Sequence, residues 1–120
     1  MDEVKIQVES MKAFFASAIK MADRLDKGDL SPEPAAMSFA SMELFLKLMT
    51  PNRWSLLRAL RQSGASSIRA LSQRLGRDYR GVHADVAALL DAGLIKRQSN
   101  TKIYVPWKKI TAEMDVEMAA

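Results

Sequence analysis

The chain has 120 residues, of which 48% are hydrophobic and 27% charged, as in one soluble globular domain or one compact domain with an extension. It has no cysteine, which excludes disulfides and thiolate metal sites, and no apolar run approaches the 18 residues of a transmembrane helix. The formal net charge is +4, from 18 Lys and Arg residues against 14 Asp and Glu residues.

The N-terminal part predicts a strand followed by an amphipathic helix. Val4, Ile6 and Val8 alternate with polar residues, a pattern typical of a half-buried strand. This stretch lacks the basic start and the apolar core of a secretory signal, so we expect a cytoplasmic protein that binds no membrane. Ser10 is a suitable N-cap for a helix over residues 11–27, whose apolar side chains recur on one stripe.

The stretch Ser31-Pro32-Glu33-Pro34 cannot continue a helix and predicts a boundary. We therefore expect three segments, namely an N-terminal strand-helix module with a linker over residues 1–35, a second domain over 36–108, and a C-terminal strand and tail over 109–120. In the C-terminal segment Ile110, Ala112, Met114, Val116 and Met118 alternate with polar or acidic residues.

The second domain is predicted to open with a short strand at residues 37–39 and a brief helix from a Ser41 cap to Leu48. Thr50 then caps a helix that runs to about residue 62, with Pro51 at its first position, where the missing N–H costs nothing. The side chains of this helix expected to face the core are Trp54, Leu56, Leu57 and Leu60.

A small strand at residues 66–68 and two helices are expected next. The first helix covers residues 69–75 and ends at Gly76, a residue suited to a left-handed C-cap. Asp78 caps the second helix, which covers residues 79–92 and ends at Gly93. Its apolar side chains expected to face the core are Val82, Val86, Leu89 and Leu90.

Two short strands, at residues 94–98 and 102–107, follow and are joined through Ser99-Asn100-Thr101. Two helices that meet at a Gly-containing turn and lead into a hairpin are the sequence pattern of a winged helix-turn-helix. The predicted fold class is α+β, with this core, an N-terminal strand-helix extension and a C-terminal strand.

Positive charge is concentrated in the second half of the chain. Residues 51–110 have 12 Lys and Arg residues against 3 Asp and Glu residues, whereas residues 1–50 have 6 against 8 and residues 111–120 have none against 3. A polyanion is the simplest partner for a segment of this charge, and the winged helix-turn-helix pattern in the same segment indicates double-stranded DNA. A solvated basic surface without a partner is the alternative that charge alone leaves open.

The helix over residues 79–92 has a polar face that suits the major groove. Once its apolar side chains face the core, residues three and four apart share the opposite face, where Arg can pair with guanine. An ordinary surface role is the alternative for each residue there. The predicted base contacts are Tyr79, Arg80, His83 and Ala84, the predicted backbone contacts are Ser66, Ser67, Arg69 and Arg77, and the predicted wing contacts are Arg97, Asn100 and Lys102. Asp85 lies between the two faces and is expected to pair with a nearby Arg.

In these elements the chain resembles MarR-type prokaryotic transcriptional regulators, and more closely a group of small predicted DNA-binding proteins. The group's Leu-Thr-Pro-x-Arg motif corresponds to Met49-Thr50-Pro51-Asn52-Arg53, with Met in place of Leu. Its Leu-Gly-Arg-Asp-x-x-x-Val-His-x-Asp-Val motif corresponds to Leu75-Gly76-Arg77-Asp78 through Val82-His83-Ala84-Asp85-Val86. The resemblance covers residues 39–106 and implies DNA binding. The position after His83 is often Arg in such sequences and is Ala84 here, which removes one contact of the group.

The function we expect is that of a sequence-specific DNA-binding regulator, a repressor, that acts as a homodimer, because dimers read two half-sites. The N-terminal strand and helix and the C-terminal strand have apolar stripes that need cover and are expected to form the dimerisation module. Several relatives resemble antitoxins, so the alternative is an antitoxin that binds a small toxin and represses its own operon. The chain has one His and no nucleophile, nucleotide-binding or metal-ligand pattern, so we expect no enzymatic activity, metal or cofactor.

Overall fold

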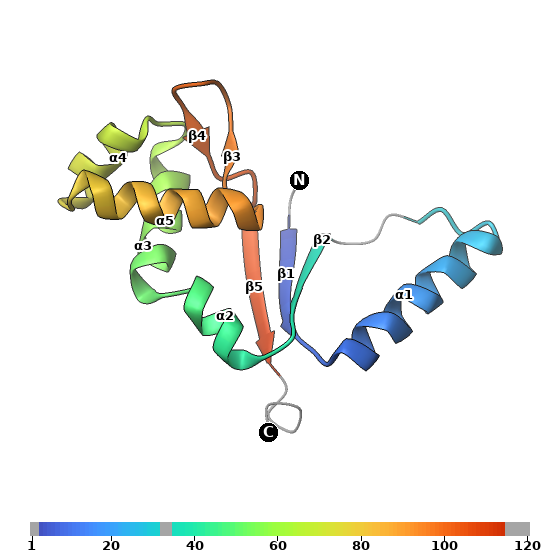
Figure 1. The fold of residues 1–120 in the computed structure, drawn as a ribbon. Helices are drawn as coiled ribbons and strands as arrows, with labels where there is room; N and C mark the ends of the chain where they lie inside the picture. The colour runs from blue at the N-terminus through green and yellow to red at the C-terminus, as the bar shows by residue number, and fades with distance from the viewer. Residues whose placement is uncertain (1–2, 32–34, 115–120) are drawn as a thin grey trace. The chain divides into compact units, whose positions relative to one another are not determined.

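The structure, a computed structural model, describes residues 3–31 and 35–114 (Figure 1). These residues form an α+β fold with five helices, a parallel three-stranded sheet and a small hairpin. The chain divides into two units, which we name and describe separately. The helical unit comprises Lys47–Lys108, and the sheet unit comprises Glu3–Leu46 and the residues from Lys109 onward. Residues 36–46 thus group with the N-terminal segment, whereas the predicted boundary placed them in the second domain.

Three helices build the helical unit, and each begins where a side chain caps its first turn. They are α3 (Pro51–Ser63), α4 (Ile68–Leu75) and α5 (Tyr79–Ala92). Such caps satisfy backbone N–H groups that have no partner within the helix. Thr50 Oγ1 accepts from Arg53 N at 3.2 Å, Ser67 Oγ accepts from Ala70 N at 3.1 Å, and Asp78 Oδ2 accepts from Gly81 N at 3.2 Å. The predicted caps at Thr50 and Asp78 are confirmed.

Glycine ends both helices of the α4–α5 pair. Gly76 has φ 64° and Gly93 has φ 83°, and both lie in the left-handed region that strains any residue with a Cβ. Gly76 lets the chain leave α4 and start α5 at Tyr79, only three residues later. The predicted left-handed C-cap at Gly76 is therefore confirmed, and the tight turn sets the start of α5.

The core of the helical unit is apolar and is shared by its helices and the hairpin. Trp54, expected to face this core, is only half-buried, whereas Leu56 is fully buried. Trp107 closes the core after the hairpin, and its Nε1 donates a hydrogen bond to the carbonyl oxygen of Gly93 at 3.1 Å. The fully buried side chains of the unit are Leu56, Leu60, Leu71, Val82, Val86, Leu89, Leu94, Ile95 and Ile103.

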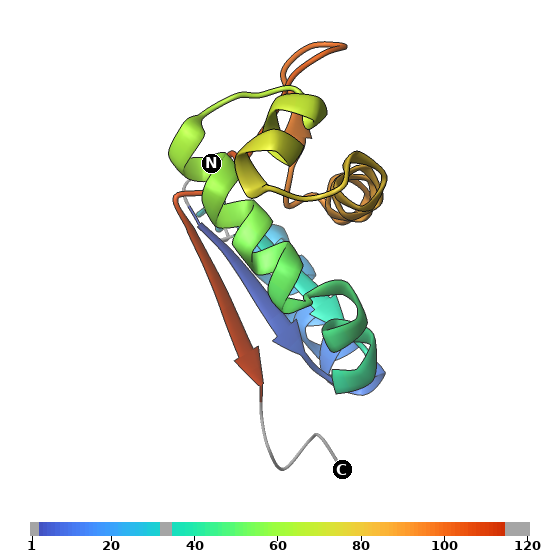
Figure 2. The same cartoon turned by 90° about the vertical axis from the view of Figure 1, so that its left-hand side faces the viewer.

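The hairpin consists of β3 (Lys96–Arg97) and β4 (Ile103–Tyr104), which pair antiparallel and are shorter than the predicted strands. The loop between them extends away from the helices in both views (Figures 1 and 2). The predicted strand at residues 66–68 is wrong, because Ser67 caps α4 and Ile68 already belongs to that helix. Only Ser66 pairs with the hairpin, through two backbone hydrogen bonds of 3.0 and 2.9 Å with Ile103.

The sheet unit has three parallel strands in the order β2-β1-β5. They are β1 (Glu3–Val8), β2 (Ala35–Phe39) and β5 (Lys109–Met114); α1 (Met11–Asp26) connects β1 to β2, and α2 (Met42–Leu48) follows β2. The predicted N-terminal strand and both helices of this region are confirmed, with caps at Ser10 and Ser41. The predicted connector at residues 32–34 and the strand positions Val116 and Met118 lie outside the described residues.

The two faces of this sheet differ in character. Val4, Ile6 and Val8 are buried on one face, and their register partners on both neighbouring strands are apolar or small. The other face is polar, and there Lys5 Nζ lies 2.9 Å from a carboxylate oxygen of Glu113. The crossover helix α1 buries none of its residues, so its apolar stripe has no cover among the described residues.

Candidate nucleic-acid interface

The solvent-facing side of α5 presents the four residues predicted to contact bases. Val82, Val86 and Leu89 are buried, and this sets the rotation of the helix. The opposite side is exposed. Small side chains there let the helix come close to the floor of a DNA groove, and long side chains there carry donors that can reach base edges. The exposed residues of this side are Tyr79, Arg80, His83, Ala84 and Ala87.

Three of the predicted site residues form one stacked cluster that bridges α4 and α5. The guanidinium carbon of Arg69 lies 4.7 Å from the centroid of the Tyr79 ring, a cation–π contact. On the same helix the rings of Tyr79 and His83 are 5.8 Å apart and tilted by 45°. The structure thus brings together Arg69, predicted to contact the DNA backbone, and two residues predicted to contact bases.

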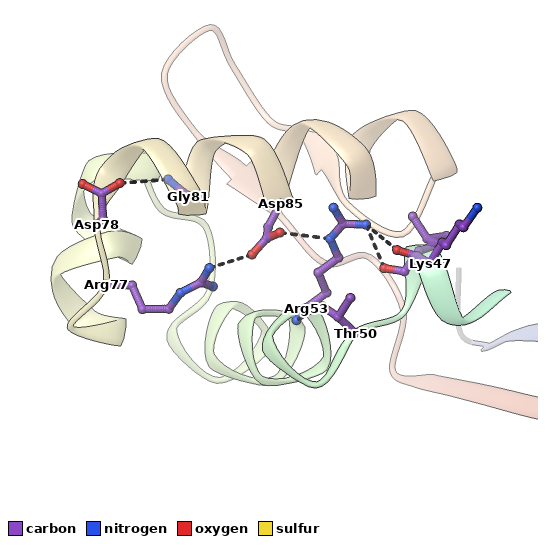
Figure 3. A network of polar contacts seen from close by, with 8 residues as sticks. Lys47, Thr50, Arg53, Arg77, Asp78, Gly81 and Asp85 are labelled. Carbon is purple, nitrogen blue, oxygen red and sulfur yellow. Dashed lines mark hydrogen bonds and ion pairs between the residues drawn. The ribbon is translucent and has the colours of Figure 1, made fainter. Parts of the chain in front are cut away.

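Asp85 is the centre of an ion-pair network within the helical unit (Figure 3). Its Oδ1 lies 3.0 Å from Arg53 Nε on α3, and its Oδ2 lies 2.8 Å from Arg77 Nη2 at the turn before α5. The three side chains are 14–27% exposed, so solvent screens the network only in part. The expectation that Asp85 pairs with a nearby Arg is confirmed, with two arginines instead of one.

Arg53 also ties the network to the last two residues of α2, Lys47 and Leu48, which belong to the helical unit. Its Nη1 donates to the carbonyl oxygens of Leu48, at 2.9 Å, and Lys47, at 3.3 Å. These carbonyls have no partner within α2 because they lie in its last turn. Arg53 is not among the site residues predicted from the sequence, although its place in the Thr50-Pro51-Asn52-Arg53 motif, one turn after the cap, is a signal for such a role.

Arg77 supports α5 from inside the unit, which differs from its predicted contact with the DNA backbone. Its Nη2 pairs with Asp85, and its Nη1 is buried without a hydrogen-bond partner among the described residues. The inward-turned guanidinium of Arg77 therefore helps to hold α5 in position. The predicted backbone contact of Arg77 has no supporting geometry here.

Gly81→Ala is expected to raise the free energy of unfolding by about 0.4–1 kcal/mol, because Ala restricts the unfolded chain more than Gly does. Gly81 has a negative φ in the first turn of α5, and an added Cβ would meet only Arg77 Nη2, at an ordinary 3.6 Å. Urea denaturation measures the change. The matched control is Gly76→Ala, where the left-handed φ of 64° makes a Cβ unfavourable and a loss of stability is expected. A loss at Gly81 as large as that at Gly76 would show that the turn cannot hold a Cβ there.

The predicted serine contacts already have partners in the chain. Ser67 Oγ caps α4, and Ser66 Oγ donates to the carbonyl oxygen of Ser67 at 2.9 Å. Both residues are half-buried beside the hairpin. Their position at the N-terminus of α4 still suits an anion, because backbone N–H groups and the helix dipole point there.

The three predicted wing residues are exposed at the outer end of the hairpin. Arg97 belongs to β3, while Asn100 and Lys102 lie in or beside the loop that follows. The loop is held by two backbone hydrogen bonds to the carbonyl oxygen of Lys102, from Gln98 at 2.9 Å and from Ser99 at 3.3 Å. The hairpin therefore presents a cation on each side of a short, internally bonded loop.

The charge of the helical unit is strongly positive. Between Lys47 and Lys108 there are 12 Lys and Arg residues and 3 Asp residues. Two of those acids already have partners within the unit, because Asp85 pairs with two arginines and Asp78 caps α5. Neither therefore fully neutralises the exposed Lys and Arg side chains. No group of three or more potential metal ligands lies close together in residues 3–31 and 35–114. None of the helices in these ranges has the length and apolarity of a membrane span.

Comparison with known proteins gives one family match. The model of the HVO_A0114 family matches residues 48–112, more than half of the chain. The matched range includes α3, α4, α5, the hairpin and the three residues of the ion-pair network. No curated protein and no solved structure matches the chain.

Proposed function

The chain belongs to the HVO_A0114 family, and we propose that its helical unit is a winged helix-turn-helix that binds double-stranded DNA in a sequence-specific manner. The order of elements supports this proposal. Two helices joined by a tight turn at Gly76 are followed by a hairpin, and Ser66 adds a third backbone pairing to that hairpin. In such a fold the second helix of the pair, here α5, enters the major groove. The MarR-like sequence features of residues 39–106 point to the same architecture.

The exposed face of α5 carries the proposal. Arg80 and His83 reach base edges from a helix that Ala84 allows close to the groove floor, and Arg is the best partner for the acceptors of guanine. The contact with Tyr79 holds the guanidinium of Arg69 beside α5, where the phosphates of bound DNA lie. Asp85 and Arg77 act beneath this face and hold α5 in position.

The hairpin contributes a second, sequence-independent contact. Arg97, Asn100 and Lys102 follow the backbone or enter the minor groove beside the site of α5. One such unit covers a single half-site, so a regulator of this kind acts as a homodimer on two half-sites about 34–36 Å apart. Occupation of such an operator blocks transcription, which makes the chain a repressor.

Binding-site selection with the full chain tests the function directly. The expected result is a duplex motif with two related half-sites, bound at a salt-dependent affinity that is higher than for unrelated duplexes. Equal affinity for all duplexes of the same length would contradict sequence-specific regulation. No binding to any duplex at low salt would contradict the proposed function as a whole.

Lys102→Ala is expected to weaken binding to all duplexes alike and to reduce the slope of log affinity against log salt by about 1, because one phosphate contact is lost. Fluorescence anisotropy at several salt concentrations measures the slope. The control is Lys20→Ala, which removes an exposed cation of α1 in the sheet unit and should leave the slope unchanged. A wild-type slope for the Lys102 variant would remove the hairpin from the DNA contacts.

A further inference from the structure

The apolar face of α1 is an exposed surface that the proposed function does not use. Its six large apolar side chains are 43–70% exposed, and no residue of the helix is buried. They share one stripe at helical spacing, and the rings of Phe14 and Phe15 touch edge to face with centroids 5.7 Å apart. The six residues are Met11, Phe14, Phe15, Ile19, Met21 and Leu25.

This surface approaches the size of a stable interface. An aromatic side chain buries roughly 150–250 Å² when fully covered. At roughly the lower of these values, six side chains that are each about half exposed offer roughly 500 Å² of apolar surface per chain. A standard protein–protein interface buries about 800 Å² per partner, and the residues that flank the stripe would add their buried area to that of the stripe itself. The patch also reaches the upper range of what monomers expose, about 300–600 Å².

The helix is already formed, so docking does not have to order it first. Ser10 caps its start and accepts from Ala13 N at 3.1 Å. At its other end Asp29 accepts from Arg24 Nε at 3.0 Å. Hydrogen bonds from the Ser31 side chain, the Ser31 backbone N–H and the Arg24 side chain lower the pKa of Asp29 to about 2, so the carboxylate keeps its charge in acidic solution as well.

The chain's own sheet does not complement this stripe. One face of the sheet is already buried at Val4, Ile6 and Val8, and the other face carries Lys5 and Glu113 as an ion pair. An apolar helix laid on that polar face would remove charges from water without pairing them. The cover for α1 must therefore be another apolar surface.

The charges beside the stripe favour a second α1 in antiparallel orientation. Asp23 and Asp26 lie 11 and 14 residues after Lys12, which is close to three and four helical turns, so all three share one edge of the stripe. Asp23 already pairs with Lys27 of its own helix at 3.0 Å. In a two-fold antiparallel pair this edge faces itself, so Lys12 of each helix meets Asp26 of the other. Antiparallel helix dipoles add to this complementarity. An anionic membrane would instead meet the two acids at the edge of the stripe.

We propose that α1 pairs antiparallel with α1 of a second copy of this chain, with the stripe as the seam and Ala18 near the two-fold axis. Met11 of one helix then lies opposite Leu25 of the other, and Phe14 lies opposite Ala22. The proposal deepens the homodimer of the proposed function and names its interface. It also places the dimer contact in the sheet unit, outside the helical unit that contains α5.

The first test measures the mass of the full chain in solution by light scattering. Wild type is expected to be a dimer, and a Phe15→Glu/Ile19→Glu double variant a monomer, with unchanged circular dichroism because both side chains are exposed. The matched control is Ala16→Glu/Lys20→Gln, which makes the same change in net charge on the side of α1 opposite the stripe and should remain a dimer. Point variants are preferred to a truncation of the N-terminal segment, because a truncation that removes α1 would also remove β1, the central strand of the sheet.

The second test determines the orientation of the helices. The natural chain has no cysteine, so single-cysteine variants report one contact each. Oxidation of a mixture of the Met11→Cys and Leu25→Cys chains should link the two variants to each other, because these positions lie opposite. Neither variant should link to itself, since two copies of position 11 are about 21 Å apart in the antiparallel pair, beyond the reach of a disulfide.

A monomeric wild type overturns the proposal, as does a Phe15→Glu/Ile19→Glu variant that stays a dimer. Self-linking of each cysteine variant, which a parallel pair produces, overturns the antiparallel arrangement. DNA binding is measured separately on the same proteins. The monomeric variant should keep its affinity for a single half-site and lose at least tenfold on the complete operator. A wild-type dimer that binds no DNA would leave this interface standing and remove the proposed function.

Discussion

Asp85→Ala is expected to lower the free energy of unfolding by about 2–4 kcal/mol. The substitution leaves Arg53 and Arg77 in a poorly solvated site without their counter-ion, and loss of one partner of a fully buried pair costs about 3–5 kcal/mol. The Asp85 side chain is 14% exposed, so the expected loss is somewhat smaller than that. Urea denaturation followed by tryptophan fluorescence measures it, because Trp54 and Trp107 both lie in the helical unit.

Two further variants show whether this effect comes from the charge network. Asp85→Asn keeps the shape of the side chain but only one acceptor oxygen, and it turns an NH2 donor toward the second guanidinium, so it should lose most of the same stability. Asp91→Ala removes an exposed acid from the same helix and should change stability by less than about 0.5 kcal/mol. Equal effects for Asp85→Ala and Asp91→Ala would mean that the network does not support α5.

Arg80→Ala is expected to reduce DNA affinity by about 1–3 kcal/mol, roughly 5- to 150-fold, and to relax the preference at one base pair. The physical reason is the loss of a bidentate contact with a guanine edge in the major groove. Stability should not change, because Arg80 is exposed on α5. Anisotropy at fixed salt measures the affinity, and repeated binding-site selection measures the preference.

The control for this prediction is Arg58→Ala, which removes the same charge from an exposed position on α3. Loss of that cation can weaken attraction to DNA in general but cannot change which bases are preferred. A selected motif that is identical for wild type and the Arg80 variant would exclude Arg80 as a base reader, whatever the change in affinity.

Local signals in the sequence predicted most of the fold. Caps at Ser10, Ser41, Thr50 and Asp78 and the left-handed glycine at position 76 act through neighbouring residues, so their effects can be read from a few positions. The prediction of a strand at residues 66–68 was wrong because Ser67 caps α4, so that the helix already begins at Ile68. The hairpin strands were overestimated, since apolar residues such as Leu94 and Val105 are buried without belonging to the ladder.

The long-range part of the structure could not be predicted from such signals. Nothing local to β5 indicates that it pairs parallel with β1, because that pairing joins residues more than 100 positions apart. The same applies to the site. The sequence placed Asp85 near an arginine, but the distance of 32 positions between Arg53 and Asp85 hid the second ion pair, and Arg77 was assigned to the DNA surface.

The residues that hold α5 and the residues that it presents to solvent are different sets along one helix. Asp85, with Arg53 and Arg77 beneath it, sets the position of α5, whereas Arg80, His83 and Ala84 project from its other side. Substitutions on the outer side therefore change little of the fold. Under the proposed function, a few mutations at these outer positions would change the DNA sequence that α5 recognises, without passing through unstable intermediates.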